Sequence, residues 1–308
     1  MPRVAAVDCG TNSIRLLVAD TDPAQGELKD LERRMEIVRL GQGVDRTGRL
    51  APEALERTFA ACRDYARAIE EHGARHVRFV ATSASRDAEN RDEFVRGVVD
   101  ILGAEPEVIT GDEEAQLSFT GATRELAGRP DLDKPYLVVD IGGGSTEFVV
   151  GDDSVRAARS VDIGCVRLTE RHGISGPVTA GLRAAMRADV SAALDEVERS
   201  VPLAHARTLV GLAGTVTTVA GIALGLDAYD SAAIHHSRVP REQIAEIVER
   251  LLASTHEERA AIPVMHPGRV DVIAAGALIL LVIMERTGAA EVVVSEHDIL
   301  DGIAWSVS

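Results

Sequence analysis

One segment of the chain occurs twice, and this repeat limits the possible folds more than any other feature. Val7–Val18 reads VDCGTNSIRLLV, and Val139–Val150, at an offset of 132 residues, reads VDIGGGSTEFVV. The copies align without gaps and share Val, Asp, Gly, Ser and the last Val. Each is an apolar strand that ends in Asp, a turn with Gly and a second apolar strand, which is the pattern of a β-hairpin. The repeat predicts two similar lobes.

Both turns carry groups that suit phosphate binding. The glycines of Gly142–Gly144 let backbone N–H groups approach an anion, and Ser145 adds a hydroxyl donor. In the first copy Thr11, Asn12 and Ser13 supply hydroxyl and amide donors. We interpret the two turns as phosphate-binding loops. The alternative is a pair of ordinary Gly-rich hairpins.

Each hairpin places an acid at the end of its first strand. These acids are Asp8 and Asp140, and a divalent cation would relieve their repulsion with bound phosphates. Glu147 follows Asp140 by seven residues and should lie across the hairpin from it, whereas the first copy has Arg15 at that position. Asp140 and Glu147 can therefore point to one metal ion.

Strands and helices alternate along the rest of the chain, which indicates an α/β protein. Short apolar runs predict strands at 77–81 and 292–295, and 208–221 predicts a strand, a Gly turn and a helix that begins at Thr215. Such a helix N-terminus is by itself only a weak sign of an anion site. The other predicted helices are 51–72, the stretch that ends at 102, a helix at Glu113 and Glu114, 178–200, 240–254, 269–286 and a short C-terminal helix. His72, His76, His235 and His236 are expected to be solvated.

Charge and cysteine content exclude several classes of protein. The chain of 308 residues has 33 basic and 49 acidic residues, a net charge of −16 that repels nucleic acid and membrane surfaces. Cys9, Cys62 and Cys165 lack CxxC spacing, which favours buried thiols in a reducing cytoplasm. We see no signal peptide, and the longest apolar run, 272–284, is too short to span a bilayer. We expect a cytoplasmic protein without nucleic-acid or membrane partners.

Seven segments, in this order along the chain, resemble the exopolyphosphatase/guanosine pentaphosphate phosphohydrolase (Ppx/GppA) family. The resemblance covers essentially the whole chain, and DIGGGSTE together with EEA is its most specific part. It implies two ribonuclease-H-like lobes of the actin, Hsp70 and sugar kinase superfamily, residues 1–125 and 126–308, with an active cleft between them. In some members the last helix returns to the first lobe. The segments are AVDCGTNSIRLLV, ATSASRDAEN, ITGDEEAQLSFTGA, VVDIGGGSTEFVV, IGCVRLTE, GLAGTVTTVAG and RVDVIAAGALIL.

The resemblance also implies roles for individual residues. Glu114 matches the catalytic glutamate that orients or deprotonates the attacking water, although acids in a first helical turn also complement the helix dipole. Asp140 and Glu147 match the pair that holds Mg²⁺, with Mn²⁺ as the alternative, and Asp8 resembles the acid of the first lobe near the metal. The positions that bind phosphate are matched by Thr11, Asn12, Ser13, Arg86, Gly143, Gly144, Ser145 and Arg269.

The implied activity is that of an exopolyphosphatase, in which water attacks in line and terminal orthophosphate leaves inorganic polyphosphate. The alternatives are a guanosine pentaphosphate 5′-phosphohydrolase, an ATP-dependent sugar or acetate-type kinase and a non-catalytic regulator, which would be expected to lose the carboxylates. Ile299–Gly302 stands where many members have Leu-Arg-Glu-Gly, and Asp162 replaces a basic residue of some members. These departures favour short polyphosphate chains or a nucleotide tail. Family habit suggests a homodimer.

Overall fold

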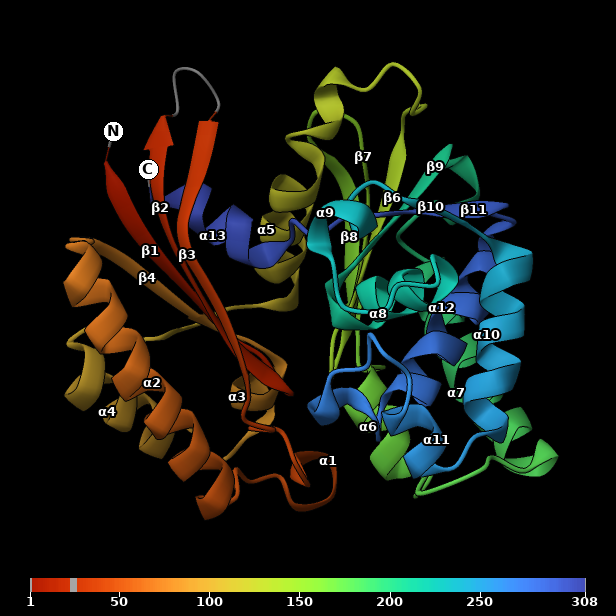
Figure 1. Cartoon of the computed structure of the whole chain (residues 1–308), viewed down its shortest axis with the longest axis horizontal. Helices are drawn as coiled ribbons and strands as arrows, with labels where there is room; N and C mark the ends of the chain where they lie inside the picture. The colour runs from red at the N-terminus through yellow and green to blue at the C-terminus, as the bar shows by residue number, and fades with distance from the viewer. Residues whose placement is uncertain (1, 23–26, 308) are drawn as a thin grey trace. The chain divides into compact units, whose positions relative to one another are not determined.

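The chain forms two compact units, each with its own β-sheet. The computed structural model describes residues 2–22 and 27–307. Unit 1 comprises Met1–Gly121 and Ile299–Ser308, and unit 2 comprises Ala122–Asp298 (Figure 1). The last helix of the chain therefore belongs to the unit that contains the first strands.

Unit 1 is a five-stranded sheet between two helical layers. Strand β1 (Arg3–Cys9) pairs antiparallel with β2 (Ser13–Asp22) and parallel with β4 (His76–Ala81). Residues of β1 alternate between the two faces of the sheet. Ala5 and Val7 pack with the helices α2 (Pro52–His72) and α4 (Arg91–Leu102). Val4 and Ala6 pack with α5 (Gly111–Thr123) and α13 (Ile299–Ser306). Burial on both faces explains why β1 is apolar from Val4 to Val7. The strand order is β3 (Glu27–Ile37), β2 (Ser13–Asp22), β1 (Arg3–Cys9), β4 (His76–Ala81), β5 (Glu107–Val108), and the helices are α1 (Val44–Thr47), α2 (Pro52–His72), α3 (Ser83–Asp87), α4 (Arg91–Leu102), α5 (Gly111–Thr123) and α13 (Ile299–Ser306).

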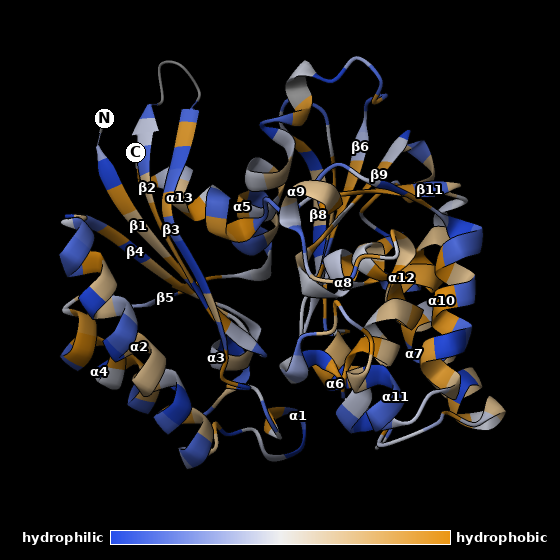
Figure 2. Ribbon diagram, in the orientation of Figure 1, coloured by the Kyte–Doolittle hydropathy of each residue, from blue (hydrophilic) through white to orange (hydrophobic). Residues whose placement is uncertain are grey.

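Unit 2 has a six-stranded sheet and a nearly fully apolar central helix. Helix α12 (Ile273–Thr287) is buried from Ile273 to Met284, and Figure 2 shows its hydrophobic colour. It packs against α6 (Cys165–Arg171), α7 (Ala180–Val197), α8 (Ala213–Ala223) and α10 (Arg241–Ala253). The strand order is β10 (Arg238–Pro240), β11 (Glu291–Val294), β9 (Thr208–Leu212), β6 (Tyr136–Ile141), β7 (Thr146–Gly151), β8 (Val155–Val161). The α-helices are α6 (Cys165–Arg171), α7 (Ala180–Val197), α8 (Ala213–Ala223), α9 (Ser231–Ile234), α10 (Arg241–Ala253), α11 (His256–Ala260) and α12 (Ile273–Thr287).

The two sheets share one topology. The order β3-β2-β1-β4-β5 in unit 1 corresponds to β8-β7-β6-β9-β11 in unit 2. In both, the first three strands in sequence are antiparallel neighbours, and two later strands, β4 and β5 or β9 and β11, extend the sheet in parallel from the first. Unit 2 has an additional edge strand, β10, which pairs antiparallel with β11. This confirms the predicted α/β fold with two ribonuclease-H-like lobes.

Some predicted boundaries are wrong, and local chemistry explains why. Strand β9 runs directly into α8 without a Gly turn, because Ala213 turns the chain with a positive φ of 66° and begins the helix two residues before Thr215. Pro267–Arg269 forms a separate 3₁₀ turn, which His266 caps, so Arg269 precedes α12 instead of starting it.

All three cysteines are buried and free, as predicted. Among the described residues, no helix combines the length and apolar character needed to cross a membrane.

Candidate active site

The two hairpins place different charges at the same register position. Asp8 lies directly opposite Arg15, and Asp140 lies directly opposite Glu147, as the spacing of seven residues predicts. Arg15 Nη2 donates to Asp8 Oδ2 at 2.6 Å. In the second hairpin both opposed side chains are acids, and both are buried. Two neighbouring buried carboxylates favour a shared cation, and oxygen ligands of this kind fit Mg²⁺.

Neighbouring elements position the second pair. Ser160 Oγ on β8 donates to Glu147 Oε1 at 2.8 Å. This bond fixes one carboxylate oxygen of Glu147 on the sheet. Sequence patterns did not single out Ser160, because β8 lacks the apolar run that marks a strand.

Helix α6 fixes the shape of the glycine loop between β6 and β7. The backbone N–H of Cys165 donates to Gly142 O at 3.0 Å, that of Val166 donates to Gly143 O at 2.9 Å, and Arg167 Nε donates to Gly144 O at 2.7 Å. These contacts turn three consecutive carbonyl groups of the loop toward α6. The protein itself therefore sets the loop conformation, which is the preorganisation that an anion-binding turn requires.

The first hairpin loop holds a buried hydroxyl that suits a ligand. The N–H groups of Val38 and Arg39 donate to Asn12 O at 3.1 and 2.8 Å, and Gly41 N donates to Thr11 O at 2.9 Å. Within the described residues, Thr11 Oγ1 is buried without a hydrogen-bond partner. A buried unsatisfied hydroxyl costs free energy, and an acceptor or donor on a bound ligand would remove that cost.

Glu114 and Glu113 are adjacent on α5 but have different surroundings. Glu114 is buried and pairs with Arg86, whose Nη1 lies 3.1 Å from Glu114 Oε2 and also donates to Ile109 O at 3.0 Å. Glu113 is more exposed and accepts from Arg78 Nη2 at 2.7 Å. The structure therefore brings the predicted catalytic acid and a predicted phosphate-binding arginine into direct contact within unit 1. Glu113 takes a structural ion pair instead.

Arg269 lies against the first turn of α8 in unit 2. A Cβ added to Gly214 would lie 2.2 Å from Arg269 Nη2, so only glycine admits the guanidinium at this place. Arg269 Nη1 donates to Thr218 Oγ1 at 3.2 Å. The N-terminus of a helix and a guanidinium both favour an anion. The positive potential at the start of α8 is therefore consistent with the predicted role of Arg269 in phosphate binding.

An acid and a phenol lie close to Arg269. Tyr229 Oη donates to Glu296 Oε1 at 2.6 Å. Burial raises the pKa of Glu296 above its usual range, and the hydrogen bond from Tyr229 and the charge of Arg269 act in the opposite direction. Sequence patterns indicated neither residue.

The predicted site residues divide between the two units. Asp8 is in unit 1, whereas Asp140 and Glu147 are in unit 2, so the predicted three-acid metal set draws on both. The other predicted residues of unit 1 are Thr11, Asn12, Ser13, Arg86 and Glu114, and those of unit 2 are Gly143, Gly144, Ser145 and Arg269.

Two of the histidines expected to be solvated lie in a cluster instead. The rings of His235 and His236 stack with centroids 3.7 Å apart, and His235 is 4.8 Å from His297. Burial lowers the pKa of His236 to about 4, with the charge on His235 as the next cause. His72 is partly exposed, and its Nε2 lies 2.6 Å from Glu32 Oε2.

Comparison with known proteins identifies relatives of the chain as a whole. The model of the Ppx/GppA phosphatase family matches residues 17–307. Exopolyphosphatase 2 of Mycobacterium tuberculosis is 53% identical over 319 residues, which cover 100% of this chain and 99% of that protein. The crystal structure of an exopolyphosphatase-like protein has a TM-score of 0.93 at 44% identity and covers 98% of both chains. Guanosine-5′-triphosphate,3′-diphosphate pyrophosphatase of Aeromonas salmonicida is 29% identical over 99% of this chain and 59% of its own length.

Proposed function

The chain belongs to the Ppx/GppA phosphatase family, and on that basis we propose that it is an exopolyphosphatase that releases terminal orthophosphate from inorganic polyphosphate. The observation that carries the proposal is the buried ion pair of Glu114 with Arg86. A relative named exopolyphosphatase matches end to end at 53% identity, whereas the guanosine pyrophosphatase matches at 29% over part of its length. This difference favours polyphosphate over guanosine pentaphosphate as the substrate.

Glu114 acts on the attacking water. Its carboxylate accepts the proton of the water, or orients it, while Arg86 holds the carboxylate through Nη1. Charge that develops on the phosphoryl oxygens requires nearby donors, and the loops at Thr11–Ser13 and Gly143–Ser145, together with Arg269, supply them. The leaving phosphate is held by the same set of donors.

Asp140 and Glu147 would hold the metal ion, which we propose is Mg²⁺, with Mn²⁺ as the alternative. When bound, such an ion neutralises negative charge on phosphate oxygens. Asp8 pairs with Arg15 at 2.6 Å, so its charge is largely compensated within unit 1. We therefore assign Asp8 a smaller part in metal binding than the other two acids.

The proposed substrate is a short polyphosphate. In the segment Ile299–Gly302, Leu300 stands where many members have the arginine of Leu-Arg-Glu-Gly. The next residue, Asp301, has its Oδ1 2.5 Å from Arg33 Nη2. Asp301 is buried and serves as a partner for Arg33, so this segment adds no cation for a long polyanion. The homodimer and the cytoplasmic location remain predictions from sequence.

The test compares two adjacent acids on one helix. Phosphate release is measured with short polyphosphate, long polyphosphate, guanosine pentaphosphate and ATP under Mg²⁺, for Glu114→Gln and for the matched control Glu113→Gln. We expect Glu114→Gln to lose about 10²- to 10⁴-fold in kcat, the usual contribution of a general base. Glu113→Gln should stay within about twofold, because Arg78 keeps its second partner Glu107.

Three outcomes would contradict the proposal. Equal rates for Glu114→Gln and the unchanged chain would exclude Glu114 as the base, provided that both proteins melt at the same temperature. Transfer of phosphate from ATP to a sugar or to acetate, in place of release to water, would support the kinase alternative. Faster release from guanosine pentaphosphate than from any polyphosphate would favour the guanosine alternative.

A further inference from the structure

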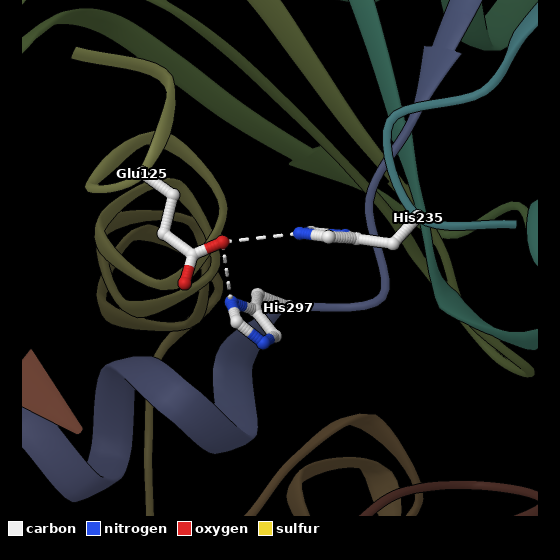
Figure 3. A group of neighbouring side chains, drawn as sticks. All are labelled: Glu125, His235 and His297. Atoms are coloured by element: carbon white, nitrogen blue, oxygen red, sulfur yellow. Dashed lines mark hydrogen bonds and ion pairs between the residues drawn. The ribbon is translucent and has the colours of Figure 1, made fainter. Parts of the chain in front are cut away.

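One carboxylate and two imidazoles converge in unit 2, and none of the three residues is among those assigned to phosphate chemistry. They belong to Glu125, His235 and His297 (Figure 3). Glu125 Oε2 lies 3.0 Å from His235 Nε2 and 3.3 Å from His297 Nδ1. One donor atom from each residue lies within 4.8 Å of the others. Figure 3 shows both rings directed at the same oxygen of Glu125.

The two separations from Glu125 Oε2, 3.0 and 3.3 Å, match those between neighbouring ligands of a small transition-metal ion. Bonds of about 2.0–2.1 Å at tetrahedral angles place ligand atoms roughly 3.3 Å apart. We propose that Glu125, His235 and His297 bind a divalent transition-metal ion of the zinc class through Oε2, Nε2 and Nδ1. Two imidazole nitrogens select such an ion over Mg²⁺ or Ca²⁺, which take oxygen ligands. Three protein ligands leave a further position to water.

Residues around the cluster support the orientation of His235. The ring of His236 stacks on it at 3.7 Å, and His236 Nδ1 lies 3.2 Å from Arg129 Nη1. The backbone of His236 has a φ of 61°, a left-handed conformation that costs energy for a residue other than glycine. The N–H of His236 donates to Val294 O at 2.7 Å, which helps to hold this conformation. The fold thus maintains the strained residue His236 in a position where its ring stacks on His235, one of the proposed ligands.

Metal binding would compete with one hydrogen bond of the present structure. His235 Nδ1 accepts from the backbone N–H of Glu296 at 3.1 Å, so in the neutral ring the proton is on Nε2, where it is donated to Glu125. A metal at Nε2 replaces that proton. If the proton moves to Nδ1, the bond from Glu296 is lost, and the segment at Glu296 must shift. The loss of one neutral hydrogen bond is small compared with three metal–ligand bonds.

The three ligands come from separate parts of the chain. Glu125 follows α5, His235 follows α9, and His297 precedes α13. The chain passes from unit 1 to unit 2 after residue 121 and returns after residue 298. An ion at this place would therefore cross-link, within unit 2, both of the segments that lead to unit 1. This position indicates a stabilising ion, bound in addition to any metal used for phosphate chemistry.

The experiment measures metal binding directly on the full chain. The protein is stripped with a chelator, placed in excess Mg²⁺ and titrated with Co²⁺, which reports its own coordination by visible absorption, and with Zn²⁺ by calorimetry. We expect one equivalent to bind and the melting temperature to rise with Zn²⁺. Glu125→Ala and His297→Ala should each weaken binding at least about tenfold. His205→Ala, at an exposed histidine of the same unit, is the matched control and should bind as the unchanged chain does.

Several results would overturn the proposal. The first is that neither Co²⁺ nor Zn²⁺ binds saturably. The second is that Glu125→Ala and His297→Ala both bind the ion as the unchanged chain does. The third is that Asp140→Asn abolishes binding whereas His297→Ala does not. The last result would place the ion at the acidic pair. Circular dichroism of each variant separates lost binding from lost folding. Because the readout is binding, the outcome is independent of phosphate release.

Discussion

Gly164 lies where the glycine loop and helix α6 meet, and replacing it with alanine tests whether α6 sets the shape of the loop. A Cβ at Gly164 would lie 2.4 Å from Gly143 O, 2.5 Å from Gly143 C and 2.7 Å from Gly144 N. Real Cβ atoms essentially never come closer than 3.0 Å to other heavy atoms. The deficit to Gly143 O is about 0.6 Å, and all three atoms are backbone, so the loop or the helix must move by at least that much.

The expected effect is larger on activity than on stability. A displacement near 1 Å in a group that positions substrate costs about 10²-fold in rate. Overpacking of this kind destabilises by roughly 1–3 kcal/mol, which a domain can tolerate while still folded. We therefore expect Gly164→Ala to fold, to melt several degrees lower and to release phosphate from polyphosphate about 10²-fold more slowly. The assay is phosphate release at saturating Mg²⁺, with melting followed by calorimetry.

Gly181→Ala is the matched control in the same unit. Gly181 lies in α7, where an added Cβ meets nothing within 4 Å. Alanine there should leave activity unchanged and stabilise by up to about 1 kcal/mol, from the higher helix propensity of alanine. If Gly164→Ala releases phosphate at the normal rate, the loop does not need the conformation that α6 gives it, and the argument from preorganisation is wrong.

Three further predictions concern other parts of the fold. Gly302→Ala should lower the free energy of unfolding of unit 1 by at least about 2 kcal/mol, because the added Cβ would lie 2.0 Å from the carbonyl oxygen of Leu117 on α5. Chemical denaturation measures this loss, and an unchanged midpoint would contradict the packing of Gly302 against α5. Arg33→Ala should cost roughly 3 kcal/mol, because it removes a charged partner of the buried Asp301, and normal stability at neutral pH would refute that role. Iodoacetamide should alkylate Cys62 very slowly in the native chain even at pH 9, because burial raises the pKa of its thiol to about 12; rapid alkylation would show that the thiol is accessible.

The hairpins could be predicted from sequence because their signals are local. An apolar run, an acid and a glycine turn fix each one, and the strand period of two puts Glu147 opposite Asp140 without further information. Strands β3 and β8 escaped prediction for a physical reason. Both are edge strands with many partly exposed positions, so polar residues replace the apolar run.

Contacts between distant residues could not be predicted in the same way. Arg86 and Glu114 meet because β4 and β5 are neighbours in the sheet, which no local pattern indicates. Glu125, His235 and His297 are far apart in sequence, and each alone resembles an ordinary surface residue. The start of α8 was misplaced because propensity does not anticipate an alanine with positive φ at position 213.

The chain order of the two units has a consequence for synthesis on the ribosome. Unit 2 is one continuous stretch and is complete before α13 is made. Until then the face of the first sheet that contains Val4 and Ala6 lacks Ile303 and the rest of α13, which cover it in the finished protein. We expect unit 2 to fold while translation continues and unit 1 to close last. A premature stop codon near the end of the gene would therefore remove α13 and leave the core of unit 1, whose first strands are encoded at the start of the gene, incomplete.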